Sequence, residues 1–252
     1  MVLPPSSEGG GIVPGAGRFR TGREAGTIGR VAATPAPAPA AARLQARTVL
    51  GRLKKRYPEA GTALAFRDPW QLLVATVLSA QTTDANVNRV TPALFARWAA
   101  PEDLAEADPE EVESAVYSTG YYRQKARAIV ALSADLMERF GGAVPADLDA
   151  LTSLRGVGRK TASVVLAEAF RRPAIAVDTH VGRLARRLGL SAAVDPSRVE
   201  VDLRALFPQR EWAGISMRFI LFGREVCTAR RPRCGACPLA DRCPFPDKTP
   251  AG

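Results

Sequence analysis

The chain has 252 residues, 46% of them hydrophobic, and carries 35 Lys and Arg against 25 Asp and Glu, a formal net charge of +10. This length is ample for a packed core, and no apolar run reaches the ~18 residues that span a bilayer. Composition therefore argues against a membrane protein, and the positive charge favours a polyanionic partner, nucleic acid before an anionic membrane surface.

Residues 1–42 are rich in Gly, Pro and Ala, as in GGGIVPGAG and ATPAPAPAAA, and contain four Arg but only two acidic residues. Such a stretch buries little apolar surface, so we expect a disordered basic tail. An organellar transit peptide is an alternative interpretation. We favour a flexible tail on a bacterial cytoplasmic protein that works at the nucleoid.

From Arg43 onward the apolar pattern is helical. Asp-Pro pairs at 68–69, 108–109 and 195–196 each place a capping carboxylate before a proline at the first helical position, and apolar stripes follow each pair. The only strand-like alternation, Ile175 and Val177, is too short for a sheet. The sequence therefore predicts an all-α protein.

The segment LRGVGRKTASVVL, residues 154–166, places a tight Gly156-Val157-Gly158 turn between a short helix and a longer one that starts near Arg159. Glycine permits a positive φ and close approach of another backbone. The N–H groups of the turn and of the following helix start form an anion site, and Val157 can face inward. The pattern is typical of a helix-hairpin-helix that grips a DNA phosphate without reading bases. An ordinary helix–helix turn is the alternative.

Lys160 is the second residue after the turn, in a chain whose 35 basic residues include only five lysines. Its ammonium could simply hold a phosphate. Alternatively it is a nucleophilic amine, which must first lose its proton, a loss that Arg159 and the positive helix start both favour. The scarcity of lysine favours the nucleophile.

Asp178 can supply a carboxylate opposite that amine. A helix over residues 159–170 rises about 16 Å. Five extended residues, 174–178, cover about 16 Å on the way back, so Asp178 returns to the level of Lys160. The same carboxylate can cap the helix that begins at Thr179. His180, the only histidine, has no Ser or Cys partner and is interpreted as a polar structural group.

Four cysteines, Cys227, Cys234, Cys237 and Cys243, have the spacing C-x6-C-x2-C-x5-C. An intracellular chain uses such a set as metal ligands rather than as disulfides. Zinc ribbons usually have two separated C-x2-C pairs, whereas only one is present here. The spacing favours a [4Fe–4S] cluster over zinc.

The loop between the first two cysteines carries Arg230, Arg231 and Arg233. A metal centre that folds such a loop would serve as a scaffold for a second phosphate contact. The alternative is that these arginines only keep a surface loop solvated.

These motifs, together with LSAQTTD (78–84) and AVDTH (176–180), resemble the endonuclease III family of bifunctional base excision DNA glycosylases over about residues 43–245. The resemblance implies a two-domain helix-hairpin-helix glycosylase fold with DNA bound between the domains. A six-helix barrel would span 62–172, and the cluster domain would join 43–61 to 173–246. Residues 1–42 and 247–252 would be flexible ends.

By resemblance, Lys160 is the nucleophile that forms a Schiff base, Asp178 is its catalytic carboxylate, and Gln81 enters the space left by the flipped base. The chain departs from the family pattern at Arg155, where proline is usual, and at Ser163, where asparagine is frequent. Tyr121 stands where many members have a leucine wedge. The residues predicted to contact DNA are Gln81, Tyr121, Arg155, Gly156, Val157, Gly158, Arg159, Arg230, Arg231 and Arg233.

The resemblance implies a monomer that acts on double-stranded DNA with oxidised or ring-saturated pyrimidines or abasic sites, with the cluster as its only cofactor. Two alternatives stay open. An adenine-specific mismatch glycosylase shares the cluster and the hairpin but lacks the hairpin lysine. A non-catalytic iron–sulfur DNA-binding protein would need neither Lys160 nor Asp178.

Overall fold

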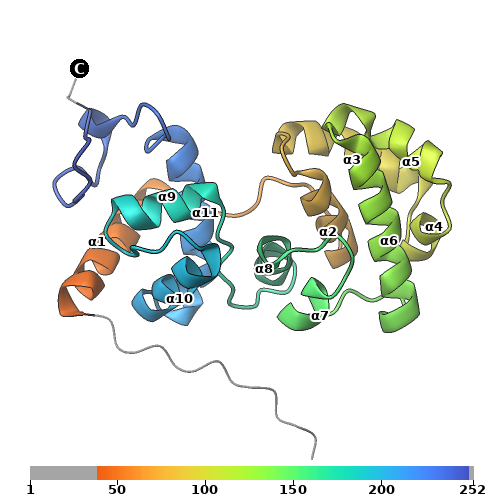
Figure 1. The fold of residues 1–252 in the computed structure, drawn as a ribbon, viewed down its shortest axis with the longest axis horizontal. Coiled ribbons are helices and arrows are strands. Elements are labelled where there is room, and N and C mark those ends of the chain that lie inside the picture. The colour runs from red at the N-terminus through yellow and green to blue at the C-terminus, as the bar shows by residue number, and fades with distance from the viewer. Residues whose placement is uncertain (1–38, 250–252) are drawn as a thin grey trace, which may run out of the picture. The chain divides into compact units, whose positions relative to one another are not determined.

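The computed structural model describes residues 39–249, so most of the predicted tail and the last three residues lie outside the described residues. Within 39–249 all regular secondary structure is helical, which confirms the all-α prediction (Figure 1). In the same range, no helix is both long and apolar enough to cross a membrane.

The α-helices are α1 (Ala40–Arg56), α2 (Pro69–Leu78), α3 (Asp84–Arg97), α4 (Pro101–Ala105), α5 (Pro109–Val116), α6 (Tyr122–Phe140), α7 (Leu148–Thr152), α8 (Arg159–Glu168), α9 (Thr179–Arg187), α10 (Pro196–Leu206) and α11 (Trp212–Glu225). Short 3-10 segments occupy Tyr117–Thr119, Gln209–Glu211 and Cys234–Ala236.

Each of the three Asp-Pro pairs begins a helix, as predicted. The carboxylates of Asp68, Asp108 and Asp195 accept hydrogen bonds from backbone N–H groups in the first turns of α2, α5 and α10, at 2.8, 3.0 and 2.9 Å. These bonds satisfy donors that a helix start otherwise leaves free.

Helix α1 begins at Ala40, three residues before Arg43, where the sequence predicted the helical part of the chain to begin. Alanine has the highest helix propensity, so the run Ala40–Ala42 extends the helix back toward Pro39. At the other end, Lys248 and Thr249 bond to the cysteine loop, where the sequence predicted a flexible terminus: the Lys248 ammonium donates to Ala240 O at 3.0 Å, and the Thr249 hydroxyl accepts from Cys234 N at 3.3 Å.

A first cluster of buried apolar side chains runs from Leu64 to Leu166 and draws on α2 to α8. Helix α2 supplies much of it, because Leu72, Leu73 and Leu78 are fully buried. Helix α2 contacts α3, α6 and α8. It therefore joins α8, the second helix of the hairpin, to the loop that follows Leu78 in one packed unit.

A second cluster joins α1 to α9, α10 and α11. Val49 and Leu53 of α1 are fully buried there with Phe219 and Phe222 of α11. The two clusters separate between residues 53 and 64 and again between 166 and 175. The predicted domain boundaries fall in these two intervals.

Candidate functional site

The turn between α7 and α8 has the conformation that the two glycines suggested. Gly156 has a φ of +77°, and Gly158 is the N-cap of α8 with a φ of −85°. Val157 is buried and its N–H donates to Leu154 O at 3.1 Å. A Cβ on Gly156 would lie 3.0 Å from the Cβ of Ala128 on α6, whereas a Cβ on Gly158 would meet nothing within 4 Å. Glycine is thus required at 156 by backbone and packing, and 158 is an open surface.

No side chain caps α8, because its N-cap is a glycine. The first N–H groups of a helix have no partner within the helix, and they carry the positive end of its dipole. Together with the exposed turn, they can receive a phosphate oxygen.

Arg155 does more than add charge to the turn. Its Nε donates to Asp135 Oδ1 and its backbone N–H to Asp135 Oδ2, both at 2.8 Å. Asp135 is buried on α6, and these hydrogen bonds from Arg155 lower the pKa of that carboxyl. The pair fastens the turn to α6 at the residue where the sequence departs from the expected family pattern, and it binds part of this guanidinium within the protein.

Arg159 is likewise bound inside the protein. Its Nε and Nη2 donate to the two carboxylate oxygens of Glu200 on α10, at 2.7 and 3.0 Å. Glu200 is buried and also accepts from Arg204 at 3.5 Å. The Arg159 charge is therefore paired within the protein, and its bond to α10 fixes the start of α8.

Lys160 is exposed in the first turn of α8, and no carboxylate within residues 39–249 lies within salt-bridge distance of its ammonium. It lines a pocket with Ser163, Val177 and the Arg159–Glu200 pair. Ile175 and Val177 line the same pocket, so this part of segment 174–178 runs back along α8. Asp178 is not among the residues that line the pocket, so its place opposite Lys160 stays a prediction.

Asp178 is half-buried and caps α9, since its Oδ1 accepts from Val181 N at 2.8 Å. Its Oδ2 has no hydrogen-bond partner in the part of the chain that the structure describes. One oxygen therefore holds the helix while the other is available to a substrate or a proton.

His180 lies in a structural network, as interpreted from the sequence. Its Nδ1 is 3.1 Å from Nη2 of Arg183, which also donates to Gly223 O and, through Nε, to Cys227 O. Burial is the main cause that lowers the pKa of His180. The network joins the helix that Asp178 caps to the cysteine loop.

Gln81 and Tyr121 lie on separate loops, each with an exposed side chain and a left-handed backbone, φ +55° and +48°. Gln81 follows α2, and Tyr121 immediately precedes α6. Their sequence context gave no sign of this conformation, which neither residue type favours.

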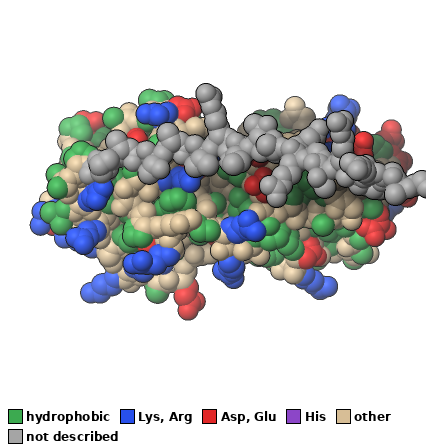
Figure 2. Space-filling model, turned by 90° about the horizontal axis from the view of Figure 1, so that it is seen from below, with side chains coloured by type: hydrophobic (Ala, Val, Ile, Leu, Met, Phe, Trp, Pro, Cys, Tyr) green, Lys and Arg blue, Asp and Glu red, His purple; other side chains and the backbone are tan. Residues whose placement is uncertain are grey.

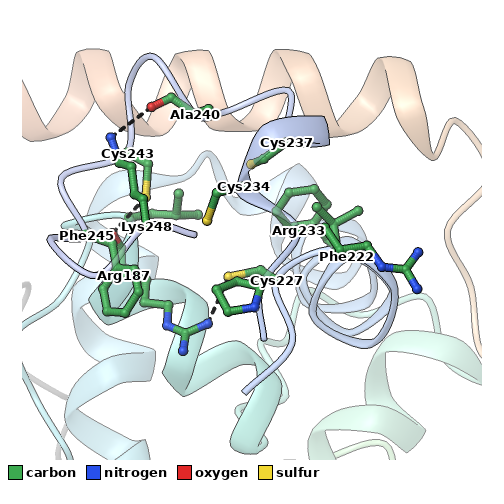
Figure 3. A pocket seen from close by; sticks show the side chains of 13 residues that line it. Arg187, Phe222, Cys227, Arg233, Cys234, Cys237, Ala240, Cys243, Phe245 and Lys248 are labelled. Carbon is green, nitrogen blue, oxygen red and sulfur yellow. Dashed lines mark hydrogen bonds between the residues drawn. The ribbon is translucent and has the colours of Figure 1, made fainter. Parts of the chain in front are cut away.

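The four cysteines line one pocket with Phe222, Phe245 and Arg187 (Figure 3). Burial and the charges of the other cysteines raise the pKa of the Cys237 and Cys243 thiols. Within 39–249 no three His, Cys, Asp or Glu side chains lie close enough to share one metal ion. Four thiols around a cavity, rather than around a point, fit a multinuclear cluster better than a single zinc ion.

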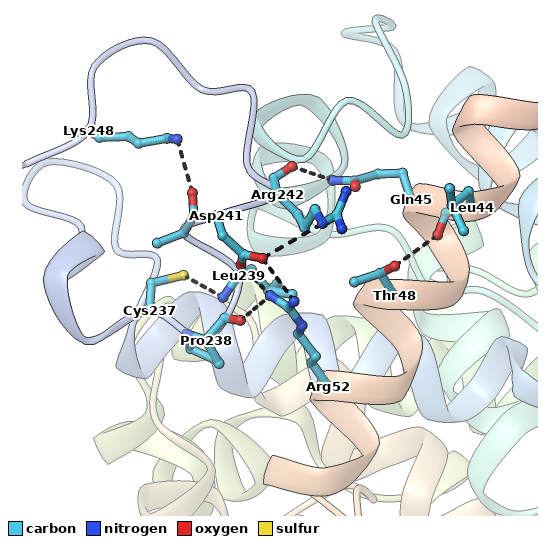
Figure 4. A network of polar contacts seen from close by, with 11 residues as sticks. Leu44, Gln45, Thr48, Arg52, Cys237, Pro238, Leu239, Asp241, Arg242 and Lys248 are labelled. Carbon is cyan, nitrogen blue, oxygen red and sulfur yellow. Dashed lines mark hydrogen bonds and ion pairs between the residues drawn. The ribbon is translucent and has the colours of Figure 1, made fainter.

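Several hydrogen bonds hold the cysteine loop. Arg187 on α9 donates to Cys227 Sγ at 3.3 Å and to Thr228 O at 2.7 Å. From the other side, Arg52 on α1 donates to Pro238 O at 2.7 Å and forms a bidentate pair with Asp241 (Figure 4). Helices α1 and α9 thus frame the ligands.

Arg230, Arg231 and Arg233 are exposed on this loop, and their side chains have no hydrogen-bond or ion-pair partner among residues 39–249. Elsewhere, Lys and Arg side chains are spread along the face that Figure 2 shows, with acidic side chains between them. The loop therefore presents three guanidinium groups without a partner among the described residues within only four positions, 230–233.

The sequence interpretation missed Asp135 and Glu200, which bind Arg155 and Arg159. It also missed Asn86 and Lys125, whose side chains donate to Ser118 O and Thr119 O, on the loop before Tyr121. Lys125 alone had a sequence signal, since it is one of five lysines and precedes the apolar stripe of α6. The other three are common polar residues whose partners lie far along the chain or on a neighbouring loop.

Comparison with known proteins places the chain in a family. The model of the HhH-GPD superfamily base excision DNA repair protein matches residues 74–209, and that of the iron-sulfur binding domain of endonuclease III matches residues 227–243. Endonuclease III of Synechocystis sp. is 50% identical over 201 residues, which cover 79% of this chain and 92% of the relative. Endonuclease III of Bacillus subtilis is 46% identical over 195 residues, which cover 77% of this chain and 89% of the relative.

A solved structure of a trapped endonuclease III–DNA covalent intermediate, an estranged-adenine complex, is 46% identical with a TM-score of 0.77 and covers 80% of this chain and 95% of that chain. The regions that the two family models match include the hairpin and all four cysteines. These cysteines hold a [4Fe–4S] cluster. The chain therefore belongs to the endonuclease III family, the bifunctional DNA glycosylases and abasic-site lyases of base excision repair.

Proposed function

We propose that this enzyme removes oxidised or ring-saturated pyrimidines from double-stranded DNA, with Lys160 as the nucleophilic amine. The observation that carries the proposal is the placement of Lys160: its ammonium has no carboxylate partner among residues 39–249, and it lines a pocket reached by the segment that ends in Asp178. A phosphate contact alone would not require a carboxylate on the returning segment.

A base inside a duplex is out of reach of an amine, so the nucleotide must be flipped out, which costs a few kcal/mol and is easiest for damaged bases. The Lys160 nitrogen then attacks C1′ of the sugar, and the bond from C1′ to the base breaks with its electron pair leaving on the base. One amine proton passes to the departing base, and the bond from C1′ to the ring oxygen O4′ breaks as O4′ takes up a proton, which leaves a protonated imine between C1′ and Lys160. The imine accepts electrons when a proton leaves C2′, and the 3′ phosphate departs.

Asp178 stabilises the positive charge that develops on the sugar and moves protons during these steps. Its free Oδ2 supports this role, since Oδ1 is occupied as the cap of α9. A carboxylate fixed by a helix start needs little reorganisation when the charge develops.

The hairpin turn and the free arginines of the cysteine loop hold the phosphates on either side of the lesion. Gln81 and Tyr121 enter the base stack from their two loops. The cluster keeps the arginine loop folded. We infer that the enzyme acts as a monomer in the bacterial cytoplasm, where the chromosome lies.

A panel of duplexes tests the proposal. Each carries one oxidised pyrimidine, ring-saturated pyrimidine, oxidised purine, A·G mismatch or abasic site, and base release, strand cleavage and borohydride trapping are measured. We expect excision with trapping for the pyrimidine lesions and trapping on the abasic site. Adenine release without trapping would favour the mismatch glycosylase, and binding without either activity would favour a non-catalytic protein.

Replacing Arg230, Arg231 and Arg233 together by glutamine should weaken binding to every duplex alike and flatten its salt dependence. The slope of log K against log salt should become shallower by about 0.9 for every phosphate that the loop no longer neutralises. Binding measured across a range of salt concentrations checks this, with iron content as the control that the loop still holds its cluster. An unchanged slope would mean that the three arginines face solvent.

A further inference from the structure

Two of the residues proposed to enter DNA have a backbone conformation that their side chains disfavour. Within residues 39–249 the non-glycine residues with positive φ are Gln81, Tyr121 and Arg171. For such residues the left-handed region is unfavourable, and it persists only where surrounding contacts enforce it. The hydrogen bonds around Gln81 and Tyr121 identify what enforces it.

Asn86, in the first turn of α3, bridges the two loops. Its Nδ2 donates to Thr82 Oγ1 at 3.0 Å and to Ser118 O at 2.8 Å. Thr82 directly follows Gln81, and Ser118 lies on the turn that leads to Tyr121. A side-chain amide has two N–H groups, so both are used in joining the loops. Its Oδ1 accepts from Arg89 Nη2 at 2.6 Å, which fixes the orientation of the amide.

Lys125, in the first turn of α6, binds the backbone of the loop that leads to Tyr121. Its ammonium donates to Thr119 O at 2.7 Å, and the residue is buried, 5% exposed. No carboxylate among residues 39–249 lies within salt-bridge distance of it. Burial lowers the pKa of this lysine. Burying an amine without a counter-charge is unfavourable, so its single strong hydrogen bond, two residues before Tyr121, is the interaction that explains its place.

The Tyr121 side chain itself is not held. It is 61% exposed, while the neighbouring Tyr117 and Tyr122 rings pack against each other with centroids 4.8 Å apart. The backbone around Tyr121 is therefore fixed and its ring is presented outward, as is the side chain of Gln81.

We propose that Asn86 and Lys125 are positioning residues that hold the Gln81 and Tyr121 loops as one unit, so that the two side chains enter the base stack together. The inference rests on the proposed function of these two side chains. Two independent loops would each lose conformational freedom on entering DNA, whereas a joined pair has already lost it. Removing either the Gln81 or the Tyr121 side chain should then also weaken the contribution of the other to excision. The effects of the two changes on the excision rate are therefore expected to be non-additive.

A double-mutant cycle tests the coupling. Gln81→Ala, Tyr121→Ala and the double variant are compared in the wild-type and Asn86→Ala backgrounds. The substrate is a duplex with one ring-saturated pyrimidine opposite 2-aminopurine, and the readouts are single-turnover base release and 2-aminopurine fluorescence. We expect each single change to slow excision at least tenfold. In the wild-type background the double variant should be roughly three- to tenfold faster than the product of the single losses predicts.

In the Asn86→Ala background, the double variant should lose excision rate by the product of the two single losses. Asn88→Ala is the matched control, because Asn88 lies on the same helix and makes two hydrogen bonds of similar length, to Ala63 and Ala65, away from both loops. It should leave the coupling unchanged. Lys125→Met, which keeps the side-chain length, should reduce the coupling and the fluorescence response, with thermal unfolding measured to confirm a folded protein.

The outcomes separate the two levels of inference. If both single changes slow excision but their effects multiply in the wild type, the positioning role is wrong and the proposed function stands. The same holds if Asn88→Ala removes the coupling as Asn86→Ala does. If neither single change affects excision or fluorescence, the proposed DNA contacts of Gln81 and Tyr121 fail.

Discussion

Replacing Lys160 by glutamine should abolish base release, strand cleavage and borohydride trapping while leaving binding to lesion DNA within a few-fold of wild type. Glutamine keeps the helix start and the hairpin, so the phosphate site persists, but it has no amine that can form an imine. Loss of a covalent nucleophile typically costs roughly 10³-fold or more in turnover. Single-turnover excision, trapping and equilibrium binding on the same duplex measure the three quantities.

Two further variants sharpen this result. Lys54→Gln removes an exposed lysine of α1 that pairs with Glu211, and it should still trap fully. Asp178→Asn should slow turnover strongly but still trap weakly, because the amine remains and asparagine is as good a helix cap as aspartate. Trapping by Lys160→Gln at near wild-type rates would show that another amine is the nucleophile and that Lys160 only contacts phosphate.

The hairpin could be predicted from the sequence because the interactions that shape it are local. A glycine with positive φ, an inward valine and a helix start all lie within four residues, 156–159. The same holds for the aspartate caps, which bond to N–H groups two or three residues away. The return of segment 174–178 along α8 could be predicted from the rise of a helix and the length of an extended segment.

The partners of the two arginines beside the hairpin could not be predicted. Arg155 binds a carboxylate 20 residues earlier on α6, and Arg159 binds one 41 residues later on α10. Sequence shows a positive charge at each position, but only the fold brings a buried Asp135 or Glu200 within reach. An arginine near a phosphate site is thus predicted as a DNA contact whether or not the protein has already neutralised it.

For the cluster site, too, the local part could be predicted from the sequence and the long-range part could not. The spacing of Cys227 to Cys243 identified the ligands, because a metal centre needs few residues close together in sequence. The anchoring of the loop by Arg52 joins residues up to 189 positions apart. That interaction could not be inferred, and it explains why α1 must pack beside the end of the described chain.

Gly156→Ala should destabilise the protein. Alanine would have to adopt the left-handed backbone of Gly156, and its Cβ would lie 3.0 Å from that of Ala128 on α6, so the turn must shift away from the helix. The two effects together should lower the free energy of unfolding by on the order of 1–3 kcal/mol, a fall in Tm of roughly 2–10 °C. Because the shifted turn no longer presents its N–H groups, affinity for DNA should fall as well.

Gly158→Ser should separate stability from binding. The φ of −85° and ψ of 167° at Gly158 suit a serine N-cap, and a Cβ there meets nothing within 4 Å. The hydroxyl can accept from the first free N–H groups of α8, so Tm should stay constant or rise slightly. Those N–H groups are the ones proposed to hold the phosphate, so affinity for undamaged and lesion duplexes should fall together, several-fold, at constant iron content. If Gly158→Ser binds DNA as wild type does, the phosphate lies elsewhere on the hairpin and the open surface at 158 has no part in binding.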